Sequence, residues 1–155
     1  MTRFFVEPEE FNQNTLCLTG ENAQHARVLR LREGEQVLLC DGLGMEALCR
    51  VEDAAFNLTV LERRTCATEA AVKVSVYMAF PKADKLEHVI QKATELGAFE
   101  IIAFPSARCV SKPDEKSLKK KLERWQKIAA SAAEQSGRGI VPKVDVLPSY
   151  KAALE

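Results

Sequence analysis

The chain has 155 residues, of which 46% are hydrophobic and 28% charged, and this composition excludes a disordered segment, collagen or a coiled coil. Its apolar runs are far shorter than the roughly 20 residues that span a bilayer, and the N-terminus reaches Pro8 too early for a secretory signal. We therefore expect a globular cytoplasmic protein without a membrane partner. Its five cysteines form no C-x-x-C pair and are expected to be reduced thiols.

The net charge of zero conceals an uneven distribution along the chain. Residues 1–70 carry seven arginines and twelve acids, a net charge of −5, whereas residues 71–155 carry fifteen basic and ten acidic residues, a net charge of +5. Residues 108–127 alone hold eight basic side chains against three acidic ones. Such a patch favours a polyanionic partner, and a solvated lysine-rich helix face explains it equally well.

The first part of the chain predicts short strands separated by turns. These strands are expected over residues 3–7, 15–19, 35–41, 45–52 and 56–63, with a hairpin turn over residues 41–44 and Pro8 ending the first strand. Apolar residues at helical spacing predict one helix after Glu21, which carries His25, Arg27 and Arg30. This part should form a small β-barrel or a curled antiparallel sheet.

The pattern changes after residues 66–71, which lack apolar periodicity, so we place a boundary there between domains of residues 1–70 and 71–155. Beyond it we expect strands over 72–80, 99–104 and 143–147, helices over 83–96 and 114–136, and a further helix from Ser149. Strands that alternate with helices predict a parallel sheet, so the fold class overall is α+β. We expect the second domain to be incomplete at its C-terminus, because about 85 residues are few for an α/β domain.

Each helix of the second domain has one apolar stripe. In the helix over 83–96 the stripe contains Leu86, Val89, Ile90, Ala93 and Leu96. The opposite face contains Lys92 and Glu95, and it is either a solvated face or a site. In the helix over 114–136, Trp125 is expected to anchor the core, and the alternative is a platform on which a base stacks.

The end of the long helix brings Glu134 and Arg138 one turn apart, where they can pair. Arg138 stands between two glycines and is expected at the tip of a helix-to-strand connection, where it either caps helix carbonyls or binds an anion. The sequence contains no dinucleotide-binding or phosphate-binding glycine motif. Neither histidine stands near a cysteine or acidic pair at ligand spacing, so no metal is expected.

Several segments occur in a familiar order and at familiar intervals. They are Arg3-Phe4-Phe5-Val6, the stretch 25–32, Phe80-Pro81-Lys82 with Asp84-Lys85, the stretch Gln-Lys-Ala-Thr-Glu-Leu-Gly at 91–97, Arg108, Arg124-Trp125, and Glu134-Gln135-Ser136 with Arg138. Together they resemble the bacterial 16S ribosomal RNA uracil-N3 methyltransferase family of the SPOUT superfamily. The resemblance covers essentially the whole chain.

The resemblance implies a PUA-like RNA-binding barrel followed by a SPOUT α/β methyltransferase domain. It implies S-adenosylmethionine as the methyl donor, 16S ribosomal RNA or the small ribosomal subunit as the partner, and a homodimer for the full-length enzyme. In the family the donor is held by a C-terminal trefoil knot. We expect this knot to be absent from residues 1–155, so that the chain contains no cofactor-binding residue and is a truncated form that is inactive by itself.

Methylation of uracil at N3 requires an acceptor for the N3 proton and positive groups that stabilise the developing anion. On the positions that the resemblance indicates, Lys92 or Arg138 would stabilise the anion, and Glu95 or Glu134 would accept the proton or orient the cation. The expected contacts to the RNA backbone are Arg3, His25, Arg27, Arg30, Arg32 and Arg108. The alternative function is a catalytically inert RNA-binding module, which S-adenosylmethionine binding would distinguish from the enzyme.

Overall fold

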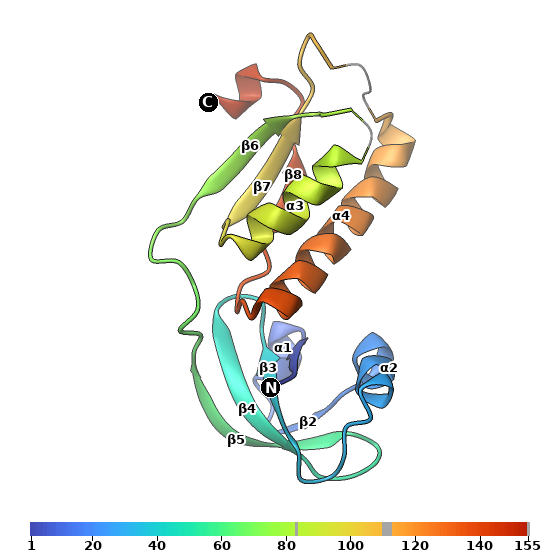
Figure 1. Cartoon of the computed structure of the whole chain (residues 1–155), viewed down its shortest axis with the longest axis vertical. Helices are drawn as coiled ribbons and strands as arrows, with labels where there is room; N and C mark the ends of the chain where they lie inside the picture. Colours follow the sequence, from blue (N-terminus) through green and yellow to red (C-terminus); the bar gives the residue numbers. More distant parts are fainter. Residues whose placement is uncertain (83, 110–112, 155) are drawn as a thin grey trace. The chain divides into compact units, whose positions relative to one another are not determined.

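The computed structural model describes residues 1–82, 84–109 and 113–154 (Figure 1). The chain divides into two compact units, unit 1 over Met1–Glu69 and unit 2 over Ala70–Glu155. Unit 1 contains a curled five-stranded sheet and unit 2 a three-stranded parallel sheet with helices (Figure 1). The predicted α+β fold class is therefore confirmed.

The sheet of unit 1 has the strand order β1-β3-β4-β5-β2. Its strands are β1 (Arg3–Phe5), β2 (Thr15–Cys17), β3 (Gln36–Cys40), β4 (Met45–Val51) and β5 (Asn57–Thr65). All neighbours pair antiparallel except β1 and β3, which pair in parallel. The sheet is curled, as expected, and it is antiparallel except at this pair, where the chain between β1 and β3 is long enough for the crossover that parallel strands need.

Two short helices lie within that crossover, α1 (Pro8–Phe11) and α2 (Gly20–Val28). The sequence interpretation missed α1 because it took Pro8 only as a strand terminator. Proline is also favoured in the first turn of a helix, where its missing N–H is not needed, and here it opens α1 and is followed by two glutamates. Phe11 at the end of α1 is buried in the core of unit 1.

The sheet of unit 2 has the order β6-β7-β8 and is parallel throughout. Its strands are β6 (Ser75–Ala79), β7 (Glu100–Phe104) and β8 (Lys143–Val146), connected by α3 (Lys85–Glu95) and α4 (Glu115–Ser136), and a 3-10 turn, η1, covers Lys151–Ala153. The two helices lie side by side on one face of the sheet (Figure 1). Trp125 is buried in the core between helix and sheet, as predicted.

The apolar stripe of α3 differs from the prediction at its end. Leu96 is 86% exposed, whereas Thr94 is fully buried and donates its hydroxyl to the carbonyl of Ile90 over 2.7 Å. The helix ends at Glu95, and Gly97 with a φ of +96° turns the chain away. The prediction extended the apolar stripe to Leu96 by helical spacing, but the helix ends one residue earlier, at Glu95.

Candidate functional site

The C-terminal end of α2 gathers the basic residues that were predicted to contact RNA. Asn22 anchors the helix by donating its amide to the carbonyl of Phe5 over 2.8 Å, and Ala23 and Ala26 face the core. His25 is half-buried and meets the ring of Phe4 edge to face, with 5.5 Å between ring centroids. The helix therefore has a packed side and an exposed side.

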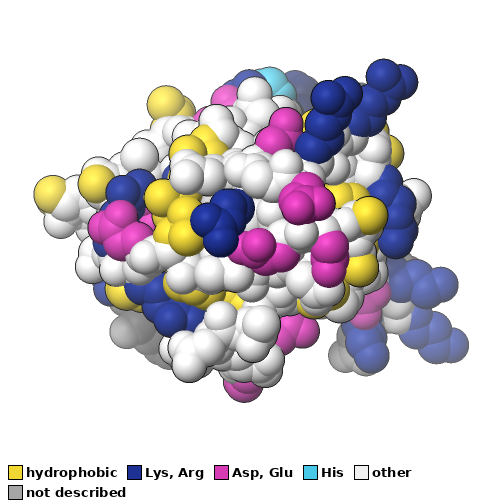
Figure 2. Space-filling view, turned by 90° about the horizontal axis from the view of Figure 1, so that it is seen from below, with side chains coloured by type: hydrophobic (Ala, Val, Ile, Leu, Met, Phe, Trp, Pro, Cys, Tyr) yellow, Lys and Arg dark blue, Asp and Glu magenta, His cyan; other side chains and the backbone are white. Residues whose placement is uncertain are grey.

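Arg27 lies on the exposed side of α2, and Arg30 and Arg32, which are also exposed, follow the end of the helix. The Arg27 guanidinium lies 5.9 Å from the centroid of the Phe56 ring, a cation–π contact. Acidic and basic side chains alternate across the face visible in Figure 2. Contact with a polyanion would therefore depend on local arginines, since unit 1 as a whole is acidic.

Arg30 has a left-handed backbone with a φ of +56°. It stands directly after the last helical turn, with the Leu31 N–H bonded to the carbonyl of Ala26 and the Arg30 N–H to that of Arg27. This is the hydrogen-bond pattern of a Schellman motif, in which the left-handed position is usually glycine. A side chain at this position carries a conformational cost of about 1 kcal/mol, so folding alone does not favour arginine here.

Arg3 does not share this exposed surface. Its guanidinium is buried, where it forms an ion pair of 3.1 Å with Glu46 and donates to the sulfur of Cys40 over 2.9 Å. Burial raises the pKa of the Cys40 thiol to about 12, although the charge of Arg3 opposes the shift. The contact of Arg3 with RNA stays a prediction, and its guanidinium is held inside unit 1 by Glu46 and Cys40.

Glu46 completes this internal cluster. It accepts a second bond from the Arg64 Nε over 2.8 Å. Burial acts to raise the pKa of the Glu46 carboxyl, yet the hydrogen bond from Arg64 and the charge of Arg3 hold it below its ordinary value. The carboxylate therefore stays ionised and joins β1 to the β4–β5 hairpin.

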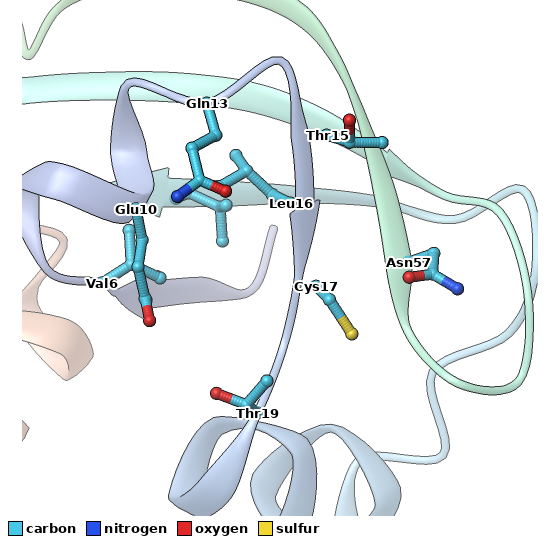
Figure 3. A pocket seen from close by; sticks show the side chains of 9 residues that line it. Val6, Glu10, Gln13, Thr15, Leu16, Cys17, Thr19 and Asn57 are labelled. Carbon is cyan, nitrogen blue, oxygen red and sulfur yellow. The ribbon is translucent and has the colours of Figure 1, made fainter.

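A small hollow of about 260 Å³ also opens on unit 1 (Figure 3). Leu16 and Leu39 are buried beneath it, and polar groups at its margin include Glu10, Gln13 and Asn57. The residues that line it include no lysine or arginine, so it does not suit a phosphate. No sequence pattern pointed to this hollow.

In unit 2, Lys92 and Glu95 lie one turn apart on α3 and form an ion pair of 2.8 Å. Both border a groove of about 370 Å³ between α3 and α4, lined by Gln91, Lys92, Glu95, Ile128, Ser131, Ala132 and Gln135. The Lys92 side chain is about half exposed, so the pair is accessible from this groove. The structure thus brings these two predicted residues together at a surface hollow.

Arg138 follows α4 but does not project from the helix tip. It is only 5% exposed, and its Nη1 donates to the carbonyls of Ala98, over 2.6 Å, and Thr94, over 3.2 Å. Gly137, with a φ of +75°, ends α4 and turns the chain toward α3. Of the two alternatives predicted for Arg138, the structure shows bonds to helix-end carbonyls, although these belong to the end of α3 and the side chain points inward from the connection. Glu134 lies half-buried in the last turn of α4.

These candidates lie at one end of the parallel sheet, and a cleft lies at the other. Since α3 and α4 return the chain from the carboxyl ends of the strands to their amino ends, Lys92 and Glu95 lie toward the amino ends (Figure 1). At the carboxyl ends a cleft of about 440 Å³ is lined by Phe80, Pro105, Pro113, Leu118, Val146, Leu147 and Pro148. Ligands of open α/β sheets bind at carboxyl ends.

Arg108 belongs to the loop that follows β7 at this carboxyl end, and it is exposed. The loop is tied down by its neighbour Cys109, whose thiol accepts from the Ser106 N–H over 3.2 Å and donates to the carbonyl of Phe80 over 3.3 Å. Arg108 is therefore separated from the Lys92–Glu95 pair by the length of the strands. The described residues contain no cluster of three or more His, Cys, Asp and Glu side chains suited to a metal.

Comparisons with known proteins define the class to which this structure belongs. The family described as "RNA methyltransferase domain" matches residues 68–155, and the family described as "RNA methyltransferase PUA domain" matches residues 18–60. The chain therefore belongs to the RNA methyltransferase family, and the resemblance inferred from its sequence is confirmed. None of the helices in the described part of the chain has the length and apolar character that a membrane crossing needs.

The particular relatives are ribosomal RNA small subunit methyltransferases E. The chain is 41% identical over 162 residues to that of Bacillus subtilis, matching 100% of this chain and 63% of the relative, and 38% identical to that of Mycobacterium tuberculosis, matching 92% and 55%. A structure of the Neisseria gonorrhoeae enzyme bound to S-adenosyl methionine has a TM-score of 0.85 at 31% identity, covering 100% of this chain and 65% of that one. The chain thus spans under two thirds of these relatives.

Proposed function

We propose that this chain forms the RNA-binding domain and part of the methyltransferase domain of an enzyme that methylates N3 of a uridine in 16S ribosomal RNA. The observation that carries the proposal is the match of unit 2 to an RNA methyltransferase domain and of residues 18–60 of unit 1 to the PUA domain of such enzymes. We further propose a cytoplasmic homodimer that acts on the small ribosomal subunit. This chain matches 63% of the length of the Bacillus subtilis relative, so the activity, substrate and partners of the complete protein are stated here as a proposal.

The RNA-binding role of unit 1 is assigned to the exposed end of α2, with His25, Arg27, Arg30 and Arg32. The strained backbone of Arg30 supports the assignment, because such strain is retained at functional positions where it is offset by the rest of the fold. Phosphate contacts by arginine position a nucleic acid without reading its sequence. Arg108 is proposed as a further contact from unit 2.

Substitution of Arg30 by glycine separates a functional residue from a structural one. Arg30→Gly should raise the stability of unit 1 by about 1 kcal/mol, because glycine adopts the left-handed backbone at no steric cost, while RNA affinity falls. Arg32→Gly is the matched control, since it removes the same charge at a residue whose backbone is not left-handed. Unchanged affinity of Arg30→Gly for a labelled fragment of 16S RNA would remove Arg30 from the interface.

The number of phosphate contacts is measured by the salt dependence of binding. Replacing Arg27, Arg30 and Arg32 together by alanine should make the slope of log affinity against log salt shallower by about 2, at roughly 0.7 per contact on single-stranded RNA. Arg50→Ala is the control, because Arg50 is exposed in unit 1 but paired with Glu52. An unchanged slope for the triple variant would show that these side chains do not contact phosphates.

For the chemistry, we propose that Glu95 accepts the uracil N3 proton and that Lys92 stabilises the resulting anion. The ion pair of 2.8 Å supports this, because it places a proton-accepting carboxylate directly beside the cation that would stabilise the anion. Arg138 bonds the carbonyl of Thr94, the residue before Glu95, so we give it a positioning role for this turn. Glu134, in the last turn of α4, is proposed to orient a cation.

S-adenosylmethionine would supply the methyl group. All described side chains that line the cleft at the carboxyl ends of the strands are apolar, so they offer no carboxylate for ribose hydroxyls and no polar side chain for the amino-acid part. The cleft therefore does not fit the cofactor by itself, and we place the cofactor site in the region that the relatives have beyond the match. Residues 1–155 alone should show no binding by calorimetry, and a micromolar dissociation constant would contradict this placement.

The activity is tested with the protein expressed from its complete gene, small ribosomal subunits and labelled S-adenosylmethionine, with 3-methyluridine identified by mass spectrometry of the digested RNA. Glu95→Gln and Lys92→Gln should each slow a single turnover. The matched control is Lys143→Gln, which breaks another exposed ion pair of unit 2, that with Asp145. Absence of 3-methyluridine with the unaltered protein would refute the function, and unaltered rates in both variants would refute only the residue roles.

A further inference from the structure

The first half of α4 is strongly basic. Between residues 113 and 127 six basic residues stand against three acidic ones, and the structure places all six at the surface: Lys116, Lys119, Lys120, Lys121, Arg124 and Lys127. Lys116, Lys119 and Lys120 have the i, i+3 and i+4 spacing that places side chains next to one another on a helix. We call these three residues the lysine face. Trp125 and Ala129 are buried on the opposite side.

Two acidic groups near the lysine face, Asp114 and Glu87, are engaged in other contacts. Asp114 caps the helix by accepting the N–H of Ser117 over 2.7 Å, which lowers the pKa of its carboxyl. Glu87 of α3 pairs with Arg124 over 2.7 Å. Glu123 is exposed one turn beyond the lysine face. Among the acidic side chains of α4 that the structure describes, a capping carboxylate thus precedes the lysine face and an exposed one follows it, and the sequence places a third acid, Glu115, directly before Lys116.

The spacing of the three lysines among themselves is unfavourable for the helix, although Glu115 and Glu123 stand four residues before and after Lys119. Like charges three and four residues apart repel each other, and cations near the N-terminus of a helix oppose its macrodipole. Helix propensity does not require lysine at these positions, because glutamine and glutamate are nearly as favourable. An anion bound across the three ammonium groups would relieve both the repulsion and the unfavourable dipole interaction.

The lysine face lies next to the loops at the carboxyl end of the sheet. Phe80, Pro113 and Leu118 line one cleft, so the chain that follows β6 lies beside the start of α4. That chain carries two further exposed cations, Lys82 and Lys85. Lys116 and Lys120 are four residues apart, a rise of about 6 Å at 1.5 Å per residue, and this spread of charge along the helix suits a linear polyanion better than a single ion.

We propose that the lysine face of α4 is a second RNA-binding surface, which holds the phosphate backbone of the RNA at the carboxyl end of the parallel sheet. The inference rests on the proposed function, since it takes RNA as the polyanion. It adds an RNA-binding surface in unit 2 to the contact proposed for Arg108 and to that of α2 in unit 1. The surface positions the RNA through its backbone and reads no base.

The test replaces Lys116, Lys119 and Lys120 together by glutamine. The matched control replaces Lys73, Lys143 and Lys151 by glutamine, which changes the net charge of unit 2 equally at other positions. Binding of a fluorescent fragment of 16S RNA is measured by anisotropy over a salt series. The lysine-face variant should bind more weakly, with a slope of log affinity against log salt shallower by about 2. Its melting temperature without RNA should not fall, because repulsion is removed.

Three outcomes of this binding test would count against the proposal, and they can be distinguished from one another. An equal loss in the control variant would mean that net charge matters and the face does not, which overturns the proposal. Wild-type affinity and slope in the lysine-face variant, alongside weaker binding after loss of Arg27, Arg30 and Arg32, would overturn the proposal and leave the proposed function standing. Failure of the unaltered protein to bind the RNA at all would count against both.

Discussion

Arg138 offers the most direct test of how the ends of the two long helices are held. Its guanidinium is buried and donates to the carbonyls of Ala98 and Thr94. Methionine at this position keeps much of the aliphatic volume but supplies no hydrogen-bond donor. The Thr94 carbonyl would retain its bond from the Gly97 N–H of 3.0 Å, so the loss falls mainly on Ala98.

The expected magnitude follows from these two bonds. A hydrogen bond from a charged donor contributes about 1.5–3 kcal/mol, and with Thr94 partly compensated the cost of Arg138→Met should be about 2–4 kcal/mol. For a unit of this size each kcal/mol corresponds to about 4–8 °C, so melting should fall by about 10–25 °C. The loss of unfolding free energy in Arg138→Lys should be smaller than in Arg138→Met but still measurable, because a single ammonium group cannot reproduce the planar fork of the guanidinium.

The assay is urea unfolding followed by tryptophan fluorescence. Trp125 is the single tryptophan of the chain and is buried in unit 2, so its emission follows that unit alone. Arg108→Met is the control, because it removes an exposed arginine from the same unit and should leave the unfolding free energy within about 0.5 kcal/mol. An equally small change for Arg138→Met would refute the role of its buried bonds.

Three further outcomes are expected. The pKa of the Glu46 carboxyl is held below its ordinary 4.5, so the stability that the ionised carboxylate contributes is present above pH 4.5 and is lost as the pH falls toward the lowered pKa. Hydrogen exchange of the amides of β3 and β4 should show this loss. Glu46→Gln should abolish the pH dependence. Alkylation of the native protein at pH 8 should label the exposed Cys17 before the buried Cys40 and Cys49. Burial raises the pKa of the Cys40 thiol to about 12 and that of the Cys49 thiol to about 11, so both stay protonated at this pH. Equal labelling of the three thiols would contradict the burial of Cys40 and Cys49. Trp125→Ala should cost about 3–5 kcal/mol of unfolding free energy, measured by circular dichroism, whereas unchanged melting with weaker RNA binding would favour the stacking platform.

Periodicity was sufficient for most elements of the fold. The helix over Glu115–Ser136 was predicted from Asp114 to Ser136 because its cap and its apolar spacing are both local signals. The parallel sheet was predicted from the alternation of strands and helices. Helix α1 was missed because four residues are too few for periodicity, and Pro8 has two local meanings.

The candidate site was less predictable, since charge alone does not show where an arginine points. Arg3, Arg27 and Arg138 are alike in sequence terms, and each was predicted to face a ligand. The structure buries Arg3 against Glu46, stacks Arg27 on Phe56, and turns Arg138 inward. These outcomes depend on partners 29 to 44 residues away, which no local pattern contains.

The sequence by itself determined the family, the fold class and the local elements, because each of these depends on residue type and spacing along the chain. Only the tertiary structure decided which cations are available to a ligand. A guanidinium is exposed or buried according to the carboxylates and carbonyls that distant strands and helix ends bring to it, and a buried cation must be paired or hydrogen-bonded there. That requirement places Arg3 and Arg138 inside the two units and leaves the arginines of α2 and the lysine face of α4 at the surface.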